Sequence, residues 1–378
     1  MSWHRPQVSF KQYSKKIPQA VIKKNSQLAL PIIMIKNTGI NSFLQLDSSI
    51  PVIDVRTPAE FAQGHICGAH NIPLFSNEER VQVGTTYKQA GREHAILLGF
   101  DLTGSKWSGF IKQALELAPD KKIAVHCWRG GMRSGAMAWC LDLYGFEVYL
   151  LTGGYKHYRH KTLDTFAEQF NIRILGGLTG SGKTRVLHQL QSLGEQVIDL
   201  EGLAQHQGSA FGSMNLMKQP SQEQFENNLA AKLRLLDPQH PVWMEDESIT
   251  IGQRSVPNAL FHQMRDAPIT VLKVAAEARV DFLVGEYGVL DKDFLKECTQ
   301  KIWKRLGPEQ TKNAITAIDE DRMADFIRTV LVYYDKTYRN GLIKRDQAKI
   351  MEIDGDGTDA LTNARLIIAQ QKERFARK

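Results

Sequence analysis

The chain has 378 residues, a length that indicates two domains rather than one. Hydrophobic residues make up 42% and charged residues 24%, as in globular proteins, and no apolar run reaches the roughly 18 residues that indicate a membrane span. The formal net charge of +7 suits a polyanionic partner such as RNA, although many cytosolic proteins are mildly basic without one.

Residues 1–33 form a basic extension that contains Lys15-Lys16 and Lys23-Lys24. It either contacts RNA or is a solvated tail, and its composition alone favours the tail. It lacks the apolar stretch and cleavage site of a signal peptide, so we expect a cytoplasmic protein that does not enter a membrane.

Residues 34–165 alternate short apolar strands with helical segments. Strands are expected over 50–55, 122–126 and 147–151, and helices over 105–117 and 134–143. This alternation predicts an α/β domain with a parallel sheet.

The same pattern restarts after a linker near 161–171, and residues 171–378 are expected to form a second α/β domain with a helical insertion. Its expected strands cover 172–176, 196–200, 242–244, 269–274 and 349–353. Helices are expected over 221–236, through most of 276–338, and from residue 359 onward. The insertion carries basic residues that suit an RNA or prenyl surface, or simply a solvated helical face; they include Arg279, Lys292, Lys296, Lys301, Lys304 and Arg305.

The first chemical motif is a loop that follows the strand at 122–126 and contains Cys127, Arg129, two glycines and Arg133. A cysteine before a helix lies at the positive end of the helix dipole, and glycines let backbone N–H groups turn inward. Both features, together with the two arginines, favour a thiolate that can carry a group covalently. Cys140 lies on an apolar helix and is expected to be structural, and no paired spacing among the four cysteines indicates a metal site.

This domain resembles the rhodanese (sulfurtransferase) family. The resemblance rests on Asp54-Val55-Arg56, Glu60-Phe61, Gly64-His65-Ile66, Asn71-Ile72-Pro73, the cysteine loop and Gly153-Gly154-Tyr155. It implies that Cys127 carries sulfur or selenium, with Asp54 and Arg56 as signature residues. Phosphatases also use Cys-x5-Arg loops, but the upstream elements favour the rhodanese family.

The second motif, residues 177–184, fits the phosphate-binding pattern G-x-x-x-x-G-K-[ST] between a strand and a helix. Gly177, Gly180 and Gly182 let the backbone approach phosphates, Lys183 reaches the outer phosphates, and the Thr184 hydroxyl is placed to bind Mg²⁺. Acidic partners for this loop are expected at the ends of neighbouring strands, from Asp199 and from the cluster Glu245-Asp246-Glu247, with Asp199, Glu245 and Asp246 as the candidates. Such a cluster can also be an acidic cap on the following segment. No water-positioning side chain can be assigned, so the motif does not predict NTP hydrolysis.

The fusion of the two loops resembles the family of bacterial tRNA 2-selenouridine synthases, and further family-like stretches cover nearly the whole chain after residue 33. They include 77–84, 87–89, 199–204, 208–212 and 225–227. The resemblance implies S-geranylation of a wobble 2-thiouridine by geranyl diphosphate, followed by replacement of the geranylthio group by selenium from selenophosphate. It implies Cys127 as an S-selanylcysteine intermediate, and no tightly bound cofactor apart from a role for Mg²⁺.

The partners implied by this resemblance are the anticodon loops of Lys, Glu and Gln tRNAs and an enzyme that supplies selenophosphate. Two other functions stay open. One is a plain sulfurtransferase joined to a small-molecule kinase, which predicts ATP turnover without RNA. The other is a non-catalytic nucleotide- or RNA-binding regulator, which predicts that Cys127 is dispensable.

Overall fold

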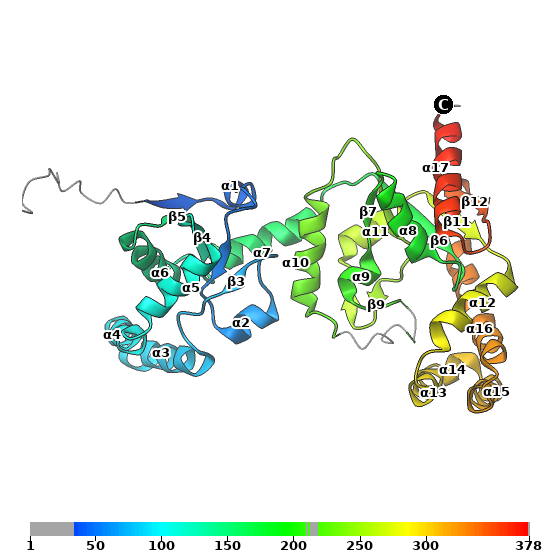
Figure 1. Ribbon diagram of the computed structural model, residues 1–378, viewed down its shortest axis with the longest axis horizontal. Coiled ribbons are helices and arrows are strands. Elements are labelled where there is room, and N and C mark those ends of the chain that lie inside the picture. Colours follow the sequence, from blue (N-terminus) through cyan, green and yellow to red (C-terminus); the bar gives the residue numbers. More distant parts are fainter. Residues whose placement is uncertain (1–33, 209–210, 212–217, 377–378) are drawn as a thin grey trace, which may run out of the picture.

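The computed structural model describes residues 34–208, 211 and 218–376, and the basic extension 1–33 lies outside this part of the chain. The fold is α/β, as predicted, with two five-stranded parallel sheets in two domains (Figure 1). None of the helices within the described ranges is both long and apolar enough to cross a membrane.

The first sheet has the strand order β1-β5-β4-β2-β3. Its strands are β1 (Ile35–Thr38), β2 (Val52–Asp54), β3 (His70–Asn71), β4 (Lys122–His126) and β5 (Glu147–Leu151). Its helices are α1 (Ile40–Leu44), α2 (Pro58–Gln63), α3 (Asn77–Ala90), α4 (Arg92–Thr103), α5 (Trp107–Leu117), α6 (Met132–Leu143) and α7 (Gly154–Thr165). The predicted strands β2, β4 and β5 are confirmed, and the sequence patterns had not indicated β1, α3, α4 or α7.

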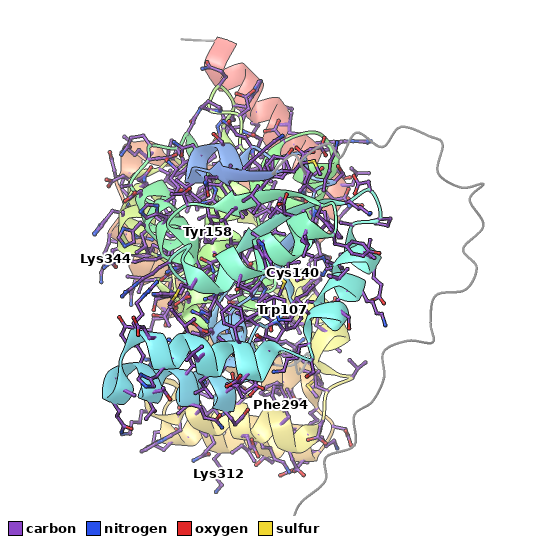
Figure 2. The ribbon with its side chains drawn as sticks, turned by 90° about the vertical axis from the view of Figure 1, so that its left-hand side faces the viewer. Trp107, Cys140, Tyr158, Phe294, Lys312 and Lys344 are labelled. Atoms are coloured by element: carbon purple, nitrogen blue, oxygen red, sulfur yellow. The ribbon has the colours of Figure 1, made fainter. Side chains whose placement is uncertain are left out.

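The core of this domain forms where β2, β4 and β5 pack against α5 and α6. Ile53, Val125 and Val148 on the strands are buried against Phe110 on α5 and Met137 on α6. In Figure 2 the first domain faces the viewer, and Trp107 on α5 and Cys140 on α6 are labelled. Cys140 is buried, as expected for a structural thiol, and burial raises its pKa.

The second sheet has the order β12-β11-β6-β8-β7. Its strands are β6 (Ile172–Gly177), β7 (Gln196–Ile198), β8 (Val242–Glu245), β11 (Ile269–Lys273) and β12 (Ile350–Asp354), and a small hairpin pairs β9 (Thr250–Ile251) with β10 (Arg254–Ser255). The helices around it are α8 (Lys183–Ser192), α9 (Leu200–Ala204), α10 (Gln222–Leu233), α11 (Asn258–Asp266) and α17 (Ala360–Ala376). Because β6 is central, the phosphate loop that follows it is flanked by the ends of β8 and β11.

The predicted helical insertion is confirmed between β11 and β12. It consists of α12 (Ala276–Tyr287), α13 (Lys292–Lys301), α14 (Trp303–Leu306), α15 (Pro308–Asp319) and α16 (Met323–Ile343), followed by the short 3₁₀ helix η1 (Gln347–Lys349). These helices have a hydrophobic core of their own and lie below the second sheet in Figure 1.

Helices α7 and α10 join the two domains and lie between the two sheets (Figure 1). Arg159 on α7 donates to the Asn227 side chain at 2.6 Å and forms an ion pair with Glu226 at 2.5 Å, both on α10. Ser221, which caps α10, donates to the carbonyl of Gln63 in the first domain. The start of α10 is therefore anchored to the loop that follows α2.

Candidate active-site loops

Cys127 lies at the end of β4, in a loop that turns directly into α6. Its Sγ atom is 3.1 Å from the Ser134 hydroxyl oxygen, which also lies 3.2 Å from the Gly131 carbonyl oxygen. Only 3% of Cys127 is exposed, so its sulfur lies at the bottom of the loop rather than on the surface. A reagent must enter the loop to reach it.

The loop is held in shape by the start of α7. Gly130 has a φ of 65°, and a Cβ atom there would lie 2.7 Å from the Leu151 carbonyl oxygen. A Cβ atom on Gly154 would collide with the backbone of Cys127 and Gly130. The N–H of Tyr155 donates to the Cys127 carbonyl at 2.8 Å. Glycine is required at both close approaches, which explains why Gly153-Gly154 accompanies the cysteine loop.

Burial is the largest single influence on the Cys127 pKa, and it acts to raise that pKa. Hydrogen bonds from the hydroxyl and N–H of Ser134, the charge of Arg133 and the N–H of Gly131 act in the opposite direction and outweigh it. The pKa of Cys127 therefore lies below that of an ordinary thiol, whereas burial raises the pKa of Cys67 and of Cys140. The environment favours the thiolate only in the loop.

Ser134→Ala should raise the Cys127 pKa, because it removes the hydroxyl that donates to the thiolate. Below that pKa, iodoacetamide should therefore modify the variant more slowly than the wild type. The pH dependence of labelling at the Cys127 peptide, followed by mass spectrometry, measures the shift. Ser108→Ala, on the exposed face of α5, is the control. An unchanged labelling profile for Ser134→Ala would contradict this role.

The two predicted arginines of this loop have different surroundings. Arg133 forms an ion pair with Glu60 at 2.6 Å, and Glu60 also accepts the N–H of Thr57 in the cap of α2. Arg133 still lowers the Cys127 pKa by its charge. Arg129 is exposed at the rim of the loop, where it can meet an incoming anion.

The signature residues Asp54 and Arg56 lie beneath the cysteine loop in the protein interior and do not face the Cys127 thiol. Both are buried, the Arg56 guanidinium donates to both Asp54 carboxylate oxygens, and it also donates to the Gly64 carbonyl at 2.6 Å. Neighbouring His126 is fully buried, which lowers its pKa to about 4 and keeps it neutral. Neither signature side chain has a hydrogen bond to Cys127.

Tyr155 connects this support to the second domain. Its ring lies over the Arg56 guanidinium at 3.7 Å from the ring centre, and its hydroxyl bonds with Glu223 at 2.7 Å and Asn227 at 2.8 Å on α10. Asn227 also donates to the His65 carbonyl at 2.9 Å. The residues under the cysteine loop are thus packed directly against the second domain.

The phosphate loop follows β6 and leads into α8, as its pattern predicts. The Lys183 ammonium donates to the carbonyls of Gly177 at 2.9 Å and Leu178 at 3.4 Å, so it lies across the loop. Gly180 and Gly182 have φ values of 82° and 72°. The Ser181 hydroxyl is buried and has no hydrogen-bond partner within the described part of the chain.

Two carboxylates, Glu201 and Glu247, approach the phosphate loop most closely. Glu201, on α9, accepts the Thr184 hydroxyl proton at 3.0 Å. Burial raises the pKa of Glu201, and burial and then the charge of Glu201 raise the pKa of Glu247 to about 8. The positive charge of Lys183 acts to lower the pKa values of both carboxyl groups. The lysine and the threonine of the motif therefore face a pair of half-buried acids.

The predicted acidic partners Asp199, Glu245 and Asp246 make other contacts. Asp199 caps α9 and bonds to His188 at 2.8 Å, and Glu245 accepts the Leu200 N–H at 3.1 Å. Asp246 forms an ion pair with Arg345 at 2.5 Å. It reaches the loop only through Tyr338, whose hydroxyl accepts the Gly177 N–H. Asp199 and Glu245 therefore hold the start of α9, and Asp246 holds Tyr338 against the loop. The acid that contacts Thr184 is Glu201, which corrects the expectation that these three would be the direct partners.

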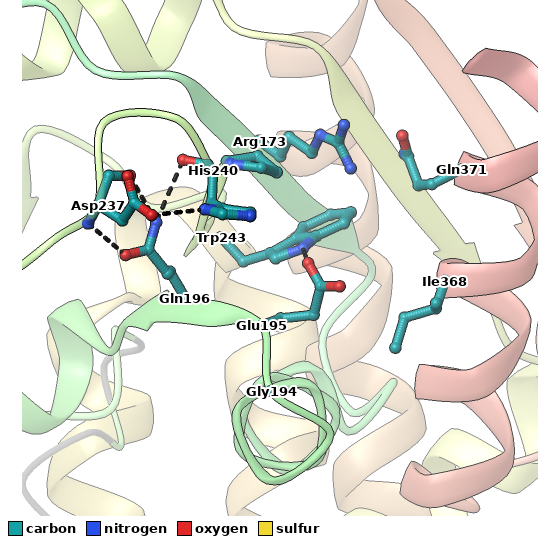
Figure 3. Close-up of a pocket in the computed structure, with 10 residues that line it drawn as sticks. Arg173, Gly194, Glu195, Gln196, Asp237, His240, Trp243, Ile368 and Gln371 are labelled. Atoms are coloured by element: carbon teal, nitrogen blue, oxygen red, sulfur yellow. Dashed lines mark hydrogen bonds and ion pairs between the residues drawn. The ribbon is translucent and has the colours of Figure 1, made fainter.

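A separate hollow of about 620 Å³ opens at the opposite edge of the second sheet, near the starts of β6, β7 and β8 (Figure 3). The Trp243 indole donates there to Glu195 at 3.1 Å, and Gln196 donates to the carbonyls of Asp237 and His240. Parallel strands place a phosphate loop at their carboxyl ends, so this hollow is distinct from both predicted sites.

Comparison with known proteins accounts for both domains. The family model described as the tRNA 2-selenouridine synthase AAA domain matches residues 170–365, which is more than half of the chain. The chain belongs to the tRNA 2-selenouridine synthase family. A rhodanese-like domain model matches residues 40–161, so the predicted resemblance to both families is confirmed.

Two relatives show how far the similarity to this family extends. The tRNA 2-selenouridine synthase of Nitrosomonas europaea is 42% identical over 246 residues, which are 63% of this chain and 63% of that protein. The Hydrogenovibrio crunogenus protein of the same name is 37% identical over 80% of this chain and 91% of its own length. A solved N-terminal domain of an ATP/GTP binding protein from Clostridium difficile 630 is 44% identical over 33% of this chain, with a TM-score of 0.32.

Proposed function

We propose that this protein converts 2-thiouridine to 2-selenouridine at the wobble position of tRNA, through an S-geranyl intermediate. The observation that carries the proposal is that one chain of this family holds both a loop that favours a thiolate and a phosphate loop. Neither loop alone accounts for a reaction that needs a diphosphate leaving group and a chalcogen donor.

The phosphate loop is the proposed site of geranylation. The sulfur of 2-thiouridine attacks the first carbon of geranyl diphosphate, the carbon–oxygen bond breaks, and diphosphate leaves. The loop N–H groups and Lys183 would stabilise the charge that develops on the leaving group. This role needs no nucleotide hydrolysis. Geranylation also makes 2-thiouridine reactive, because an alkylated sulfur is a better leaving group in the next step.

A magnesium ion suits the acids at this loop. Thr184 and Glu201 would hold it, since their oxygens are 3.0 Å apart. The raised pKa values of Glu201 and Glu247 reflect neighbouring, partly desolvated carboxylates that a cation would stabilise. No three His, Cys, Asp or Glu side chains in the described ranges form a metal-ligand set, so diphosphate and water would supply most ligands. When bound, Mg²⁺ would neutralise charge on the diphosphate.

The cysteine loop is the proposed site of selenium transfer. Cys127 would take selenium from selenophosphate and hold it as S-selanylcysteine, while Arg129 at the rim and Arg133 beside the thiolate attract the anionic donor. In forming this species the Cys127 thiolate attacks selenium, the selenium–phosphorus bond breaks, and phosphorus leaves with the electron pair as phosphite. The terminal selenium then attacks C2 of the base, and the carbon–sulfur bond breaks as the geranylthiolate leaves. A thiol reductant finally cleaves the sulfur–selenium bond, forming a disulfide with Cys127 and freeing 2-selenouridine. The lowered pKa of Cys127 favours the thiolate, which is the nucleophile of this step.

The proposed RNA substrates are the Lys, Glu and Gln tRNAs, and a selenophosphate-supplying enzyme would deliver the donor in the cytoplasm. Wobble bases lie in a single-stranded loop, so moving one base into a protein site costs little. The net charge of +7 favours this partner.

Nucleoside mass spectrometry of tRNA from cells with and without the gene tests the function. We expect deletion to remove 2-selenouridine and S-geranyl-2-thiouridine together while 2-thiouridine remains. Persistence of both modified nucleosides would refute the proposal. ATP turnover without RNA, with thiosulfate:cyanide transfer by the purified protein, would instead support the sulfurtransferase–kinase alternative.

A further inference from the structure

An aromatic ring stands at the rim of the cysteine loop, directly beside the buried thiol. Trp128 follows Cys127 in the chain, and 37% of Trp128 is exposed, whereas the thiol lies at the bottom of the loop. Consecutive Cα atoms are about 3.8 Å apart, so the indole lies within roughly one side-chain length of the sulfur. A molecule that reaches Cys127 from solvent therefore passes close to this ring.

The Trp128 indole is held in place from one side. It packs on the Tyr155 ring, with ring centres 5.8 Å apart and planes inclined by 42°, and the Arg56 guanidinium lies 6.0 Å from its ring centre. The Trp128 carbonyl accepts the Lys156 N–H at 2.9 Å. The part of the ring that these contacts leave uncovered is open to solvent. A ring that is already fixed loses little conformational entropy when a ligand stacks on it.

Three exposed cations belong to the same rim. Arg129 follows Trp128, and Lys156 is joined to it by the backbone hydrogen bond. Arg92, at the start of α4, is also exposed, and its guanidinium lies 4.0 Å from the sulfur of Met132 in the cysteine loop. Positive side chains around an exposed ring are the combination with which proteins bind single-stranded nucleic acid, because the cations contact phosphates and the ring contacts a base.

The helical insertion, the other predicted RNA surface, is less suited to this role. Arg279 was expected on that surface, but it is buried and donates to the Asp335 carboxylate at 2.9 and 2.8 Å. Lys292 and Lys296 form ion pairs with carboxylates of the insertion itself. Three of the six basic residues predicted there thus have acidic partners, and the rim of the cysteine loop is the better candidate for contact with RNA.

The chemistry of the proposed reaction decides which part of the RNA meets the ring. Selenium transfer requires C2 of the wobble base to lie next to the selenium held on Cys127. Once this base leaves the stack of the anticodon loop, its flat face is free, and every base has a face that can stack on an indole. Trp128 is the residue whose position beside the sulfur suits this contact.

We propose that the wobble base stacks on Trp128 while selenium is transferred from Cys127. This inference rests on the proposed function and deepens it, because it names a side chain that contacts the substrate. The indole positions the base above the loop, and the exposed cations of the rim hold the neighbouring phosphates. Because stacking acts on the bound base both before and during the reaction, losing the ring should chiefly weaken binding.

A pair of anticodon stem-loop RNAs tests the contact, one with S-methyl-2-thiouridine and one with an abasic site at the wobble position. Trp128→Ala should weaken binding of the base-containing RNA by about tenfold, the loss expected for one base stack, and should leave the affinity for the abasic RNA unchanged. Trp139→Ala is the matched control, since Trp139 on α6 is 57% exposed, and it should change neither affinity. Neither RNA carries a prenyl group, so the measurement reports on the base.

Two further variants separate stacking from support of the loop. Trp128→Phe should bind nearly as the wild type does, whereas Trp128→Leu, which fills space against Tyr155 without a flat ring, should behave as Trp128→Ala does. Selenophosphate alone should still add selenium to the Cys127 peptide of Trp128→Leu. Wild-type affinity of Trp128→Leu, equal losses for the two RNAs, or loss of this selenium labelling would overturn the assignment. Failure of the wild type to bind either RNA would refute the proposed function instead.

Discussion

Cys127→Ala is expected to abolish selenium transfer, lowering the rate by roughly a thousandfold or more, and to leave geranylation intact. The variant removes the one thiol whose surroundings lower its pKa, while the backbone amides of the loop remain. Reaction of the purified protein with 2-thiouridine tRNA, geranyl diphosphate and selenophosphate should then stop at S-geranyl-2-thiouridine, as measured by nucleoside mass spectrometry.

Cys140→Ala is the matched control, because Cys140 is a buried thiol on α6 whose pKa is raised by burial. It should retain both steps. Treating the wild type with selenophosphate alone should also add selenium to the Cys127 peptide and to no other cysteine peptide. Selenation by Cys127→Ala at the wild-type rate would mean that selenophosphate attacks the base directly and that the loop only binds the anion.

Lys183→Ala should produce the opposite pattern, a loss of geranylation of about a hundredfold with selenation of S-geranyl tRNA retained. Its ammonium group is the positive charge of the phosphate loop, and it donates to the carbonyls of Gly177 and Leu178. Single-turnover assays with each isolated step measure the two rates separately.

Lys36→Ala is a suitable control, since Lys36 is an exposed lysine on β1 of the first domain, where it forms an ion pair with Glu147. Its geranylation rate should equal that of the wild type. If Lys183→Ala geranylated 2-thiouridine tRNA at the wild-type rate, the diphosphate would have to bind elsewhere. That result would refute the phosphate loop as the geranylation site.

The sequence predicted those parts of the fold that show a local pattern. Alternating buried strands and the two glycine-rich loops identified β4, β6 and the helices that follow them. Helix α3 was missed because none of its residues is buried, so it has no apolar stripe. Its start is nevertheless marked by the capping box of Ser76 and Glu79, a signal that can be read from the sequence.

The candidate site was predicted only where its residues lie within one motif. Cys127, Lys183 and Thr184 could be named, whereas the contact of Ser134 with the Cys127 sulfur is seen only in the structure. Glu201 was passed over in favour of Asp199, two residues earlier, because spacing alone cannot tell which acid turns toward the loop. The pairing of Arg279 with Asp335 joins residues 56 positions apart, and only the packing of α12 on α16 reveals it.

The hydrogen bonds of Tyr155 to Glu223 and Asn227 have a practical consequence for protein engineering. A chimera that exchanges one half of this chain for that of a relative would place a foreign α10 against the ring that covers Arg56. Selenium transfer at Cys127 would then be impaired, although every residue of the cysteine loop is native. Functional exchange should therefore be designed with α7 and α10 transferred as a single cassette.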